Sequence, residues 1–486
     1  MTLILRNCSW IYCCDDAGSI IAPGYIRIDG MLISEIGHEP YPGSDGEMID
    51  LAGSIVLPGF VNVHHHFFQS LTKAVPPATR ATGLDWLYQM YPIWACYDAD
   101  AIATASELAA AELLLSGATT SVDHSYLHPQ LGAESVAAQV DAVARTGLRF
   151  HLVRGALPTI EGDLEVRLNE VMGPALREMM EDRSALMPAL AHAIRAYDDA
   201  SVGSMRRVDL GPTGITYLYP ELMPQIAALA AQHGCGLHTH YHPRQSDREL
   251  SRRLLGREPL SFLTDCGWIR PRTWMAHSTQ LNDEEIVAFA DHGVGVAHCP
   301  HTIIRLGFPI TRVVAMRRRG LAVGIGVDGA ASNDRSSMIQ EMRLALLLHR
   351  ANSPENVQAA TDWLDAIDIL HMATREGARI LGRKDIGILK VGMCADIVAF
   401  DLGSIHYAGA VADPLAALLL AGCDTRAKLT MVNGQIRVRD GHLISIDERQ
   451  LVRHANTTSQ RILDESSNRF GVPRHEYENR PAKGLR

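Results

Sequence analysis

Short apolar runs alternate with Ala- and Leu-rich segments of helical character along most of the chain. Helices are expected, for example, over Asp100–Ser116, Glu221–His233 and Asn282–His292. Strands that alternate with helices predict a parallel sheet, and eight such units predict an α/β fold, a (β/α)8 TIM barrel over residues 58–390. The predicted barrel strands are Ile55–His64, Thr119–Asp123, Leu148–Val153, Val208–Gly211, Gly236–His240, Thr273–His277, Gly295–His298 and Ala322–Val327.

Both ends of the chain show a different pattern, typical of β-hairpins. Asp29-Gly30 and Asn433-Gly434 are turn sequences flanked by alternating apolar and polar residues. Isolated hairpins are only marginally stable in water. We therefore expect residues 1–57 and 391–450 to form one small β-sandwich, with two separate edge hairpins as the alternative. Residues 451–486 are expected to form a C-terminal helix and an exposed tail.

Composition and charge narrow the class of protein. A hydrophobic content of 47% and a charged content of 21% are typical of a globular enzyme. The net charge of −10 argues against a nucleic-acid partner or an anionic membrane. The nine cysteines form no CxxC pair, and Met1–Arg6 lacks the features of a signal peptide. No apolar run approaches the roughly 20 residues that span a bilayer. We expect a cytoplasmic protein with free thiols.

Candidate metal ligands stand at the ends of the predicted strands. Three consecutive histidines follow the first strand, and alternation along a strand places His64 and His66 on one face and His65 on the other. Two imidazoles on one face are suitable metal ligands, although a His-rich surface turn is the alternative. His240, His277 and Asp328 end later strands. Since all strands of such a barrel open onto one mouth, these side chains are expected to converge there.

The motifs that carry these residues resemble the amidohydrolase superfamily. They are PGFVNVHHHFFQS, HTH, AHS, AHCP and VGIGVDGAASND, in this order along nearly the whole chain. The set is most similar to the cytosine/guanine-deaminase branch, in particular to 8-oxoguanine deaminases, isoxanthopterin deaminase and hydroxyatrazine aminohydrolases. The resemblance implies one divalent metal, with zinc expected and iron as the alternative, because the fourth strand has no carboxylated-lysine signature.

The resemblance also assigns roles to individual residues. It implies His64, His66, His240 and Asp328 as metal ligands, Asp328 as a proton acceptor, and His277 as a contact to the attacking water or the substrate. Gln69 matches an amide that holds a substrate carbonyl. Trp86 and Tyr91 fall in the segment that caps the pocket in relatives, where their rings could stack on a planar heterocycle. The resemblance further implies a small heterocyclic substrate and a homodimer.

One departure from the family affects the mechanism. Members of this branch carry a glutamate three residues after the fifth-strand histidine, and here that position is Pro243. A one-residue gap would align His242 with the missing glutamate, and imidazole can carry a proton near neutral pH. Alternatively, His242 is a structural loop residue and Asp328 carries the proton alone.

Near the seventh strand, Thr302-Ile303 replaces a polar Ser-Asn pair of relatives, and His301 is either a pocket residue or a loop histidine without a role. Ser332, Asn333 and Asp334 are expected to fix the loop that carries Asp328.

The sequence therefore predicts a metal-dependent hydrolytic deaminase of an amino-substituted nitrogen heterocycle of the oxopurine, pterin or s-triazine type. The alternative is hydrolysis of another carbon–nitrogen bond, in a lactam, an amide or a urea-like group. A third hypothesis is a metal-binding protein without catalytic activity.

Overall fold

The computed structural model describes residues 2–128, 132–160, 162–351, 363–422 and 426–473. The expected tail, from residue 474 onward, lies outside the described residues.

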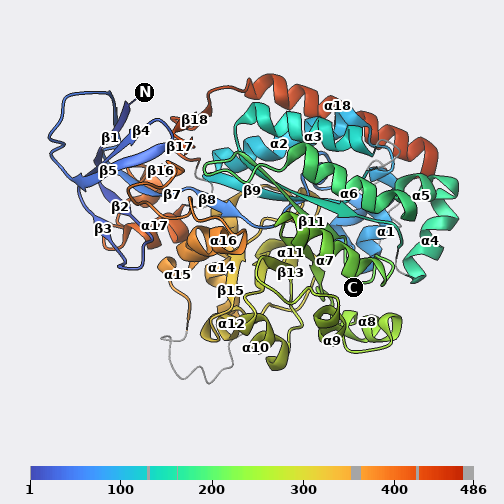
Figure 1. Cartoon of the computed structure of the whole chain (residues 1–486). Coiled ribbons are helices and arrows are strands. Elements are labelled where there is room, and N and C mark those ends of the chain that lie inside the picture. Colours follow the sequence, from blue (N-terminus) through green and yellow to red (C-terminus); the bar gives the residue numbers. More distant parts are fainter. Residues whose placement is uncertain (1, 129–131, 161, 352–362, 423–425, 474–486) are drawn as a thin grey trace, which may run out of the picture.

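Eight parallel strands form the predicted barrel and are adjacent in sequence order (Figure 1). They are β8 (Phe60–Asn62), β9 (Ala118–Ser125), β10 (Arg149–Ala156), β11 (Arg206–Pro212), β12 (Leu237–Tyr241), β13 (Thr273–His277), β14 (Gly295–His298) and β15 (Ala322–Ile325). The first and last strands meet where the Val63 amide donates to the Ile325 carbonyl (3.0 Å). The Asp328 amide donates to the His64 carbonyl, also at 3.0 Å, which holds two predicted metal ligands side by side.

Helices surround the barrel and follow its strands. The main covering helices are α2 (Ala99–Leu115), α3 (Ala133–Thr146), α6 (Arg183–Tyr197), α7 (Leu222–His233), α10 (Asp283–Asp291), α12 (Val313–Arg318) and α14 (Met338–Ala351). The segments after the strands add η1 (Phe67–Leu71), η2 (Pro76–Arg80), α1 (Gly83–Trp94), α4 (Gly162–Met172), α5 (Pro174–Met179), α8 (Asp247–Leu255), α9 (Pro259–Asp265), α11 (Pro300–Arg305) and α13 (Ala330–Asn333). α15 (Ala366–Ala373) and α16 (Arg375–Ile380) complete this ring.

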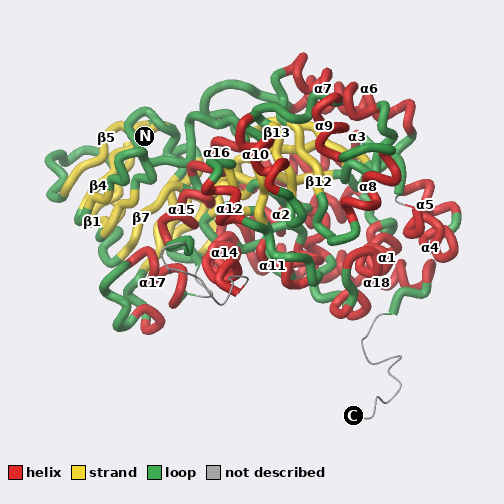
Figure 2. Tube along the Cα trace, turned by 90° about the horizontal axis from the view of Figure 1, so that it is seen from below, coloured by secondary structure: helices red, strands yellow, loops and turns green. Residues whose placement is uncertain are grey.

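Two further sheets form the accessory β-domain, which lies at one end of the molecule in Figure 2. A four-stranded sheet contains β1 (Thr2–Cys8), β4 (Gly24–Asp29), β5 (Leu32–His38) and β6 (Glu47–Asp50). A seven-stranded sheet joins both ends of the chain through β2 (Trp10–Tyr12), β3 (Ile20–Ile21), β7 (Ser54–Pro58), β16 (Ile397–Asp401), β17 (Leu429–Val432), β18 (Gln435–Arg439) and β19 (His442–Leu443). A shared apolar core contains side chains from both sheets, such as Ile26 and Ile397. The predicted fold class is thereby confirmed.

The expected first strand, Ile55–His64, was wrong as a single element. β7 belongs to the accessory sheet and β8 to the barrel, with the break at Gly59 between them. The Gly59 amide donates to the Asp396 carbonyl, and a Cβ on Gly59 would lie 2.2 Å from the Thr119 side chain. Only glycine permits this close approach, so the chain changes sheets there.

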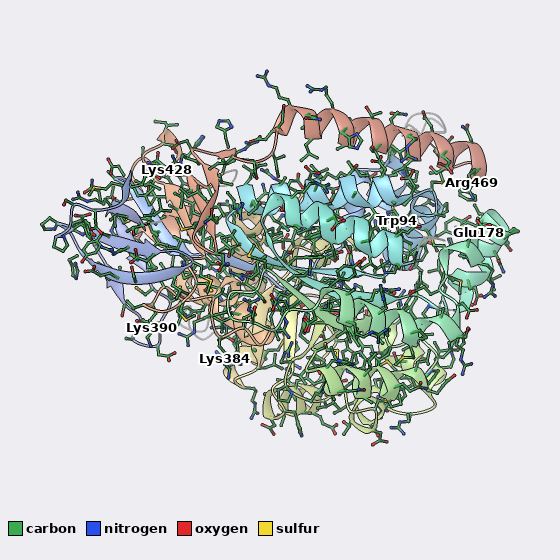
Figure 3. All side chains as sticks on the ribbon, turned by 45° about the horizontal axis from the view of Figure 1, so that its top comes forward. Trp94, Glu178, Lys384, Lys390, Lys428 and Arg469 are labelled. Atoms are coloured by element: carbon green, nitrogen blue, oxygen red, sulfur yellow. The ribbon has the colours of Figure 1, made fainter. Side chains whose placement is uncertain are left out.

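The C-terminal helix α18 (Glu448–Phe470) packs along α2, α1 and η1 on the outside of the barrel. Figure 3 shows Arg469 near its end, far from Lys428 beside the accessory sheets. The helix begins at Glu448, slightly before the expected boundary at residue 451, and the domain boundaries themselves stay a prediction. The remaining elements are η4 (Ile405–Tyr407) and α17 (Pro414–Ala421). Across the described residues, no helix is both long enough and apolar enough to span a membrane.

Candidate metal centre

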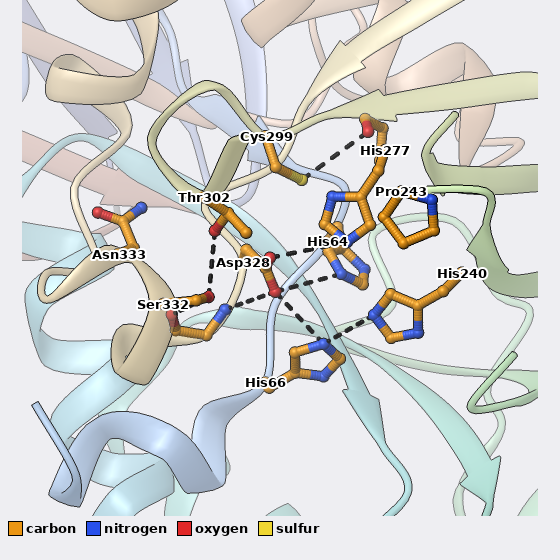
Figure 4. A network of polar contacts seen from close by, with 12 residues as sticks. His64, His66, His240, Pro243, His277, Cys299, Thr302, Asp328, Ser332 and Asn333 are labelled. Atoms are coloured by element: carbon orange, nitrogen blue, oxygen red, sulfur yellow. Dashed lines mark hydrogen bonds and ion pairs between the residues drawn. The ribbon is translucent and has the colours of Figure 1, made fainter. Parts of the chain in front are cut away.

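Four elements of the barrel deliver the predicted ligands to one place (Figure 4). His64 and His66 lie in the segment directly after β8, whereas His65 points away and contacts Ser336 Oγ (3.0 Å) through its Nε2. His240 lies on β12 and His277 ends β13. Asp328 follows β15 by a short loop. The predicted convergence of these side chains is therefore present in the structure.

The facing atoms of the cluster are close together. Asp328 Oδ1 lies 3.4 Å from His64 Nε2 and 3.3 Å from His66 Nε2, and Oδ2 lies 3.8 Å from His277 Nε2. His66 Nε2 and His240 Nε2 are 3.1 Å apart. His64 and His66 come from the same strand end, and His240, His277 and Asp328 each come from a different one.

A second set of contacts orients the imidazoles. His64 Nδ1 contacts His238 Nε2 at 2.7 Å, and His238 Nδ1 in turn contacts the Trp274 carbonyl at 2.8 Å. His66 Nδ1 contacts the His124 carbonyl at 2.9 Å, and His240 Nδ1 contacts the carbonyl of Thr213. Carbonyl partners require a proton on Nδ1, so Nε2 of His66 and of His240 carries a lone pair toward the cluster.

Burial determines the protonation state of this cluster. It lowers the pKa of His64, His66 and His277, and it lowers the pKa of His240 to about 3. Burial alone would raise the pKa of Asp328, but its hydrogen bond with His64 outweighs burial, so this pKa lies well below its ordinary value. Neutral imidazoles beside an ionised carboxylate are the states that metal ligation requires.

These donor atoms suit a divalent cation. The ligand-capable atoms of His64, His240, His277 and Asp328 all lie within 4.8 Å of one another. Imidazole nitrogens with one carboxylate oxygen are ligands that zinc and other transition metals accept. The residues present therefore fit the metal that the sequence implies.

His124, on β9, adds an imidazole that the sequence analysis did not include among the ligands. Its ring lies within the same 4.8 Å limit of His64, His66 and His240, and it is fully buried. Burial holds the pKa of His124 well below its usual value. Its position directly after Asp123, at the end of a predicted strand, is the sequence feature that could have identified it as a candidate ligand.

The backbone is strained beside the cluster. His277, Ser278 and Asp328 adopt φ values of 65°, 51° and 63°, and His242 adopts 43°. Residues with side chains seldom adopt this left-handed region, and such strain concentrates at functional sites.

The cluster lies at the base of a pocket, and several of its side chains line that pocket. Gln69 from η1, Trp86 and Tyr91 from α1, and His277 line it together with His66, His240 and Asp328. Gly329 permits the approach of Gln69, because a Cβ there would lie 1.9 Å from Gln69 Oε1. The pocket residues that the sequence analysis missed include Tyr126, Thr213, Ile215, Tyr217 and Phe308.

His242 and Pro243 also line the pocket. His242 Nε2 contacts Ser251 Oγ of α8 at 3.1 Å, so the ring is anchored to the pocket wall. Burial lowers the pKa of His242 to about 3, which keeps the imidazole neutral.

Ser332 and Asn333 fix the loop that carries Asp328 as expected, whereas the Asp334 side chain accepts from the Ala74 amide (2.8 Å) and from Arg305 Nε (3.0 Å) instead. Asn333 Nδ2 donates to the Val327 carbonyl (2.6 Å), and Ser332 Oγ donates to the Gly329 carbonyl (3.0 Å). His301 is absent from the pocket lining; its Nδ1 lies 2.6 Å from Glu341 Oε1 instead.

Comparisons with known proteins agree with this site. The model of the Amidohydrolase family matches residues 55–437. The chain belongs to the amidohydrolase family. It is an enzyme of the class that hydrolyses carbon–nitrogen bonds other than peptide bonds.

Several curated relatives are similar over most of their length. The 8-oxoguanine deaminase of Pseudomonas aeruginosa is 35% identical, covering 91% of this chain and 95% of the relative. The hydroxydechloroatrazine ethylaminohydrolase of Pseudomonas sp. (strain ADP) is 34% identical, covering 86% and 85%. An isoxanthopterin deaminase from an unknown prokaryotic organism is 32% identical, covering 93% and 94%. Among solved structures, the atrazine chlorohydrolase of Arthrobacter aurescens TC1 complexed with zinc superposes with a TM-score of 0.86 at 31% identity, covering 94% of this chain and all (100%) of that chain.

Proposed function

We propose that this amidohydrolase is a hydrolytic deaminase of an amino-substituted nitrogen heterocycle of the oxopurine, pterin or s-triazine type. The observation that carries the proposal is the cluster of imidazoles and one carboxylate at the base of a pocket with aromatic walls. The named activities of the relatives on oxopurine, pterin and triazine compounds support the substrate class.

His64, His66, His240 and Asp328 are the proposed ligands of one divalent ion, with zinc expected and iron as the alternative. The zinc in the Arthrobacter structure supports this assignment. Such an ion lowers the pKa of water toward about 7 and so supplies a nucleophile at neutral pH.

Asp328 is the proposed general base. Its carboxylate is ionised and faces the imidazoles, so it can accept the proton of the attacking water. His277, 3.8 Å from Asp328, is positioned to polarise the substituent of the target carbon. Water adds to that ring carbon, and the amino nitrogen leaves as ammonia once it gains a proton.

Two residues are candidates for that last proton transfer. Asp328 could return the proton that it accepted, and His242 could supply one from the pocket wall. The low pKa of His242, about 3, favours Asp328, because a neutral imidazole is a weak acid at working pH.

Gln69, Trp86 and Tyr91 are the proposed substrate contacts. Trp86 and Tyr91 offer flat apolar faces to a planar ring, and Gln69 offers a hydrogen-bonding amide beside Gly329.

A second candidate function is hydrolysis of a lactam, amide or urea-like bond. Pro243 has no titratable group at the position where deaminases of this branch carry a glutamate, and Asp328 alone suits that chemistry as well.

The test is ammonia release from a panel of amino-oxopurines, aminopterins and amino-s-triazines by the metal-loaded enzyme. Stoichiometric ammonia with formation of the oxo product supports the first function. Turnover of cyclic amides with no ammonia from any exocyclic amine supports the second.

We further propose that the protein works as a homodimer in the cytoplasm. Among the described cysteines, every one is buried and free, which suits a reducing compartment.

A further inference from the structure

Two hydroxyl groups meet in the pocket wall beside Asp328. Thr302, on α11, and Ser332, on α13, both line the pocket, and their Oγ atoms are 3.1 Å apart (Figure 4). Thr302 and Ser332 are both almost completely buried, with exposed fractions of 1% and 2%. The proposed mechanism uses neither residue.

The hydrogen bonds fix the direction of both protons. Ser332 Oγ donates its single proton to the Gly329 carbonyl (3.0 Å), since a carbonyl can only accept. Ser332 Oγ must then accept from Thr302, so the contact between the two hydroxyls runs from Thr302 to Ser332. With its proton engaged in this way, the Thr302 hydroxyl has only lone pairs left for a partner in the pocket that Thr302 lines.

A buried carboxylate fixes the positions of the two hydroxyl-bearing residues relative to each other. Glu341, on α14, accepts from the Asn333 side chain (2.5 Å) and from the His301 amide (3.2 Å), and His301 Nδ1 lies 2.6 Å away. His301 precedes Thr302, and Asn333 follows Ser332. The short helices α11 and α13 are thus fastened to the same side chain.

We propose that Thr302 is a specificity-determining residue that acts as an obligate hydrogen-bond acceptor. It selects heterocycles that present an N–H donor, such as the lactam N–H of an oxo-substituted ring, over analogues that carry an N-alkyl group or a bare ring nitrogen there. The inference rests on the proposed function for its substrate class, and it narrows that class to oxo-heterocycles with a free ring N–H.

The test compares an amino-oxopurine that the enzyme deaminates with each of its mono-N-methyl isomers. For one isomer, we expect the ratio of kcat/KM between parent and isomer to be about tenfold lower in Thr302→Val than in wild type. Valine matches threonine in size, so any clash with the methyl group is the same in both proteins, and the change in the ratio reports the hydrogen bond alone. Thr302→Ser keeps the hydroxyl and is expected to keep the wild-type ratio.

Ser332→Ala tests the proton order. Without Ser332, the Thr302 proton is free to turn into the pocket, so we expect new activity on the O-methyl lactim ether, which presents a ring nitrogen as acceptor in place of the N–H. Thr264→Val is the matched control, because the Thr264 hydroxyl donates within its own helix α9 to the Leu260 carbonyl.

The outcomes separate this inference from the proposed function. If Thr302→Val leaves the ratio unchanged for every isomer, the inference is wrong even though deamination stands. If Thr302→Val does not fold, absence of activity of Ser332→Ala on the lactim ether overturns it. If wild type releases no ammonia from any heterocycle, the proposed function fails, and calorimetric binding of the same oxopurine and its N-methyl isomers then tests Thr302 through the ratio of Kd values.

Discussion

The carboxylate of Asp328 faces imidazoles from two other strand ends, with one oxygen near His64 and His66 and the other near His277. This geometry gives the residue two proposed tasks, as a ligand and as a base. Its amide is held by the His64 carbonyl and its Oδ1 accepts from the Gly329 amide (2.7 Å), so the side chain has little freedom.

Asp328→Asn is therefore expected to lower kcat by at least about 10²-fold, because the amide retains the size but neither the charge nor the basicity. The same variant should bind less metal, which elemental analysis of the purified protein measures. Asp283→Asn, at an exposed carboxylate 84% accessible to solvent, is the control. Wild-type turnover and metal content in Asp328→Asn would contradict both roles.

His242 gives a second residue-scale prediction. Its ring contacts Ser251 and is neutral because burial lowers its pKa to about 3. We expect His242→Asn to lower kcat by less than about tenfold, since in the proposed mechanism Asp328 returns the proton to the leaving nitrogen. Single-turnover rates of ammonia release measure this. A loss as large as that of Asp328→Asn would instead identify His242 as the proton donor.

At the scale of elements, strand ends could be predicted from the sequence, whereas contacts between loops that are distant in the sequence could not. His64, His66, His240 and His277 could be placed because strand alternation and the common mouth of a barrel fix their direction. Thr302 and Ser332 lie on two short helices whose mutual position depends on Glu341, which is 40 residues from His301 in the sequence. The pattern of residues within one helix does not encode its contacts with a residue that distant in the sequence.

The break at Gly59 shows the same limit. Ile55–His64 is one apolar run, and periodicity alone cannot divide it between two sheets. The division depends on the approach of Thr119 and on the Asp396 carbonyl. His238 was within reach of sequence reasoning, because alternation places it on the same inward face of β12 as His240.

The ion pair between His301 and Glu341 predicts a pH-dependent stability of the α11–α13 pair. Burial alone would lower the pKa of His301, but Glu341 outweighs it and raises the pKa, with Asp334 adding to the effect. A raised pKa in the folded state means that the stabilisation is fully present below the unfolded value of about 6.5 and is lost as pH rises through the folded pKa.

His301→Gln should therefore destabilise the protein more in acidic than in alkaline buffer. Urea midpoints of wild type and variant, measured from pH 5.5 to 9 on metal-loaded protein, give the difference. The difference between the two urea midpoints is expected to shrink as pH rises. A difference that grows with pH would show that the charged His301–Glu341 pair does not stabilise the fold.

At the scale of the whole molecule, a buried ion pair joins the barrel to the accessory sheets. Arg149 of β10 contacts Asp396, which precedes β16, through Nε (3.2 Å) and Nη2 (2.8 Å), and both side chains are inaccessible. Arg149 also donates to the carbonyls of Gly203 and Ser204.

Asp396→Asn is expected to cost about 3–5 kcal/mol of stability, because it leaves a buried guanidinium without its counter-charge. Chemical denaturation followed by tryptophan fluorescence measures the loss. Glu47→Gln is the matched control: it removes the exposed pair of Glu47 with Arg439, which also links the two ends of the chain, and should cost less than about 1 kcal/mol. Equal effects of the two variants would contradict a special role for the buried pair.

Removal of the metal tests the site and the fold together. The proposed ligands come from the segment after β8, from β12 and from the loop after β15, so an ion bound there would tie strands from both sides of the barrel seam. A ligand that binds only the folded state stabilises it by about 4 kcal/mol when present at a thousandfold excess over its Kd. A chelator is therefore expected to abolish ammonia release and to lower Tm by several degrees, and added zinc should restore both. The same treatment of Asp328→Asn should shift Tm much less, because that variant lacks one of the proposed ligands. If chelation empties the wild-type protein of metal and yet changes neither Tm nor turnover, the imidazole cluster is not a functional metal centre.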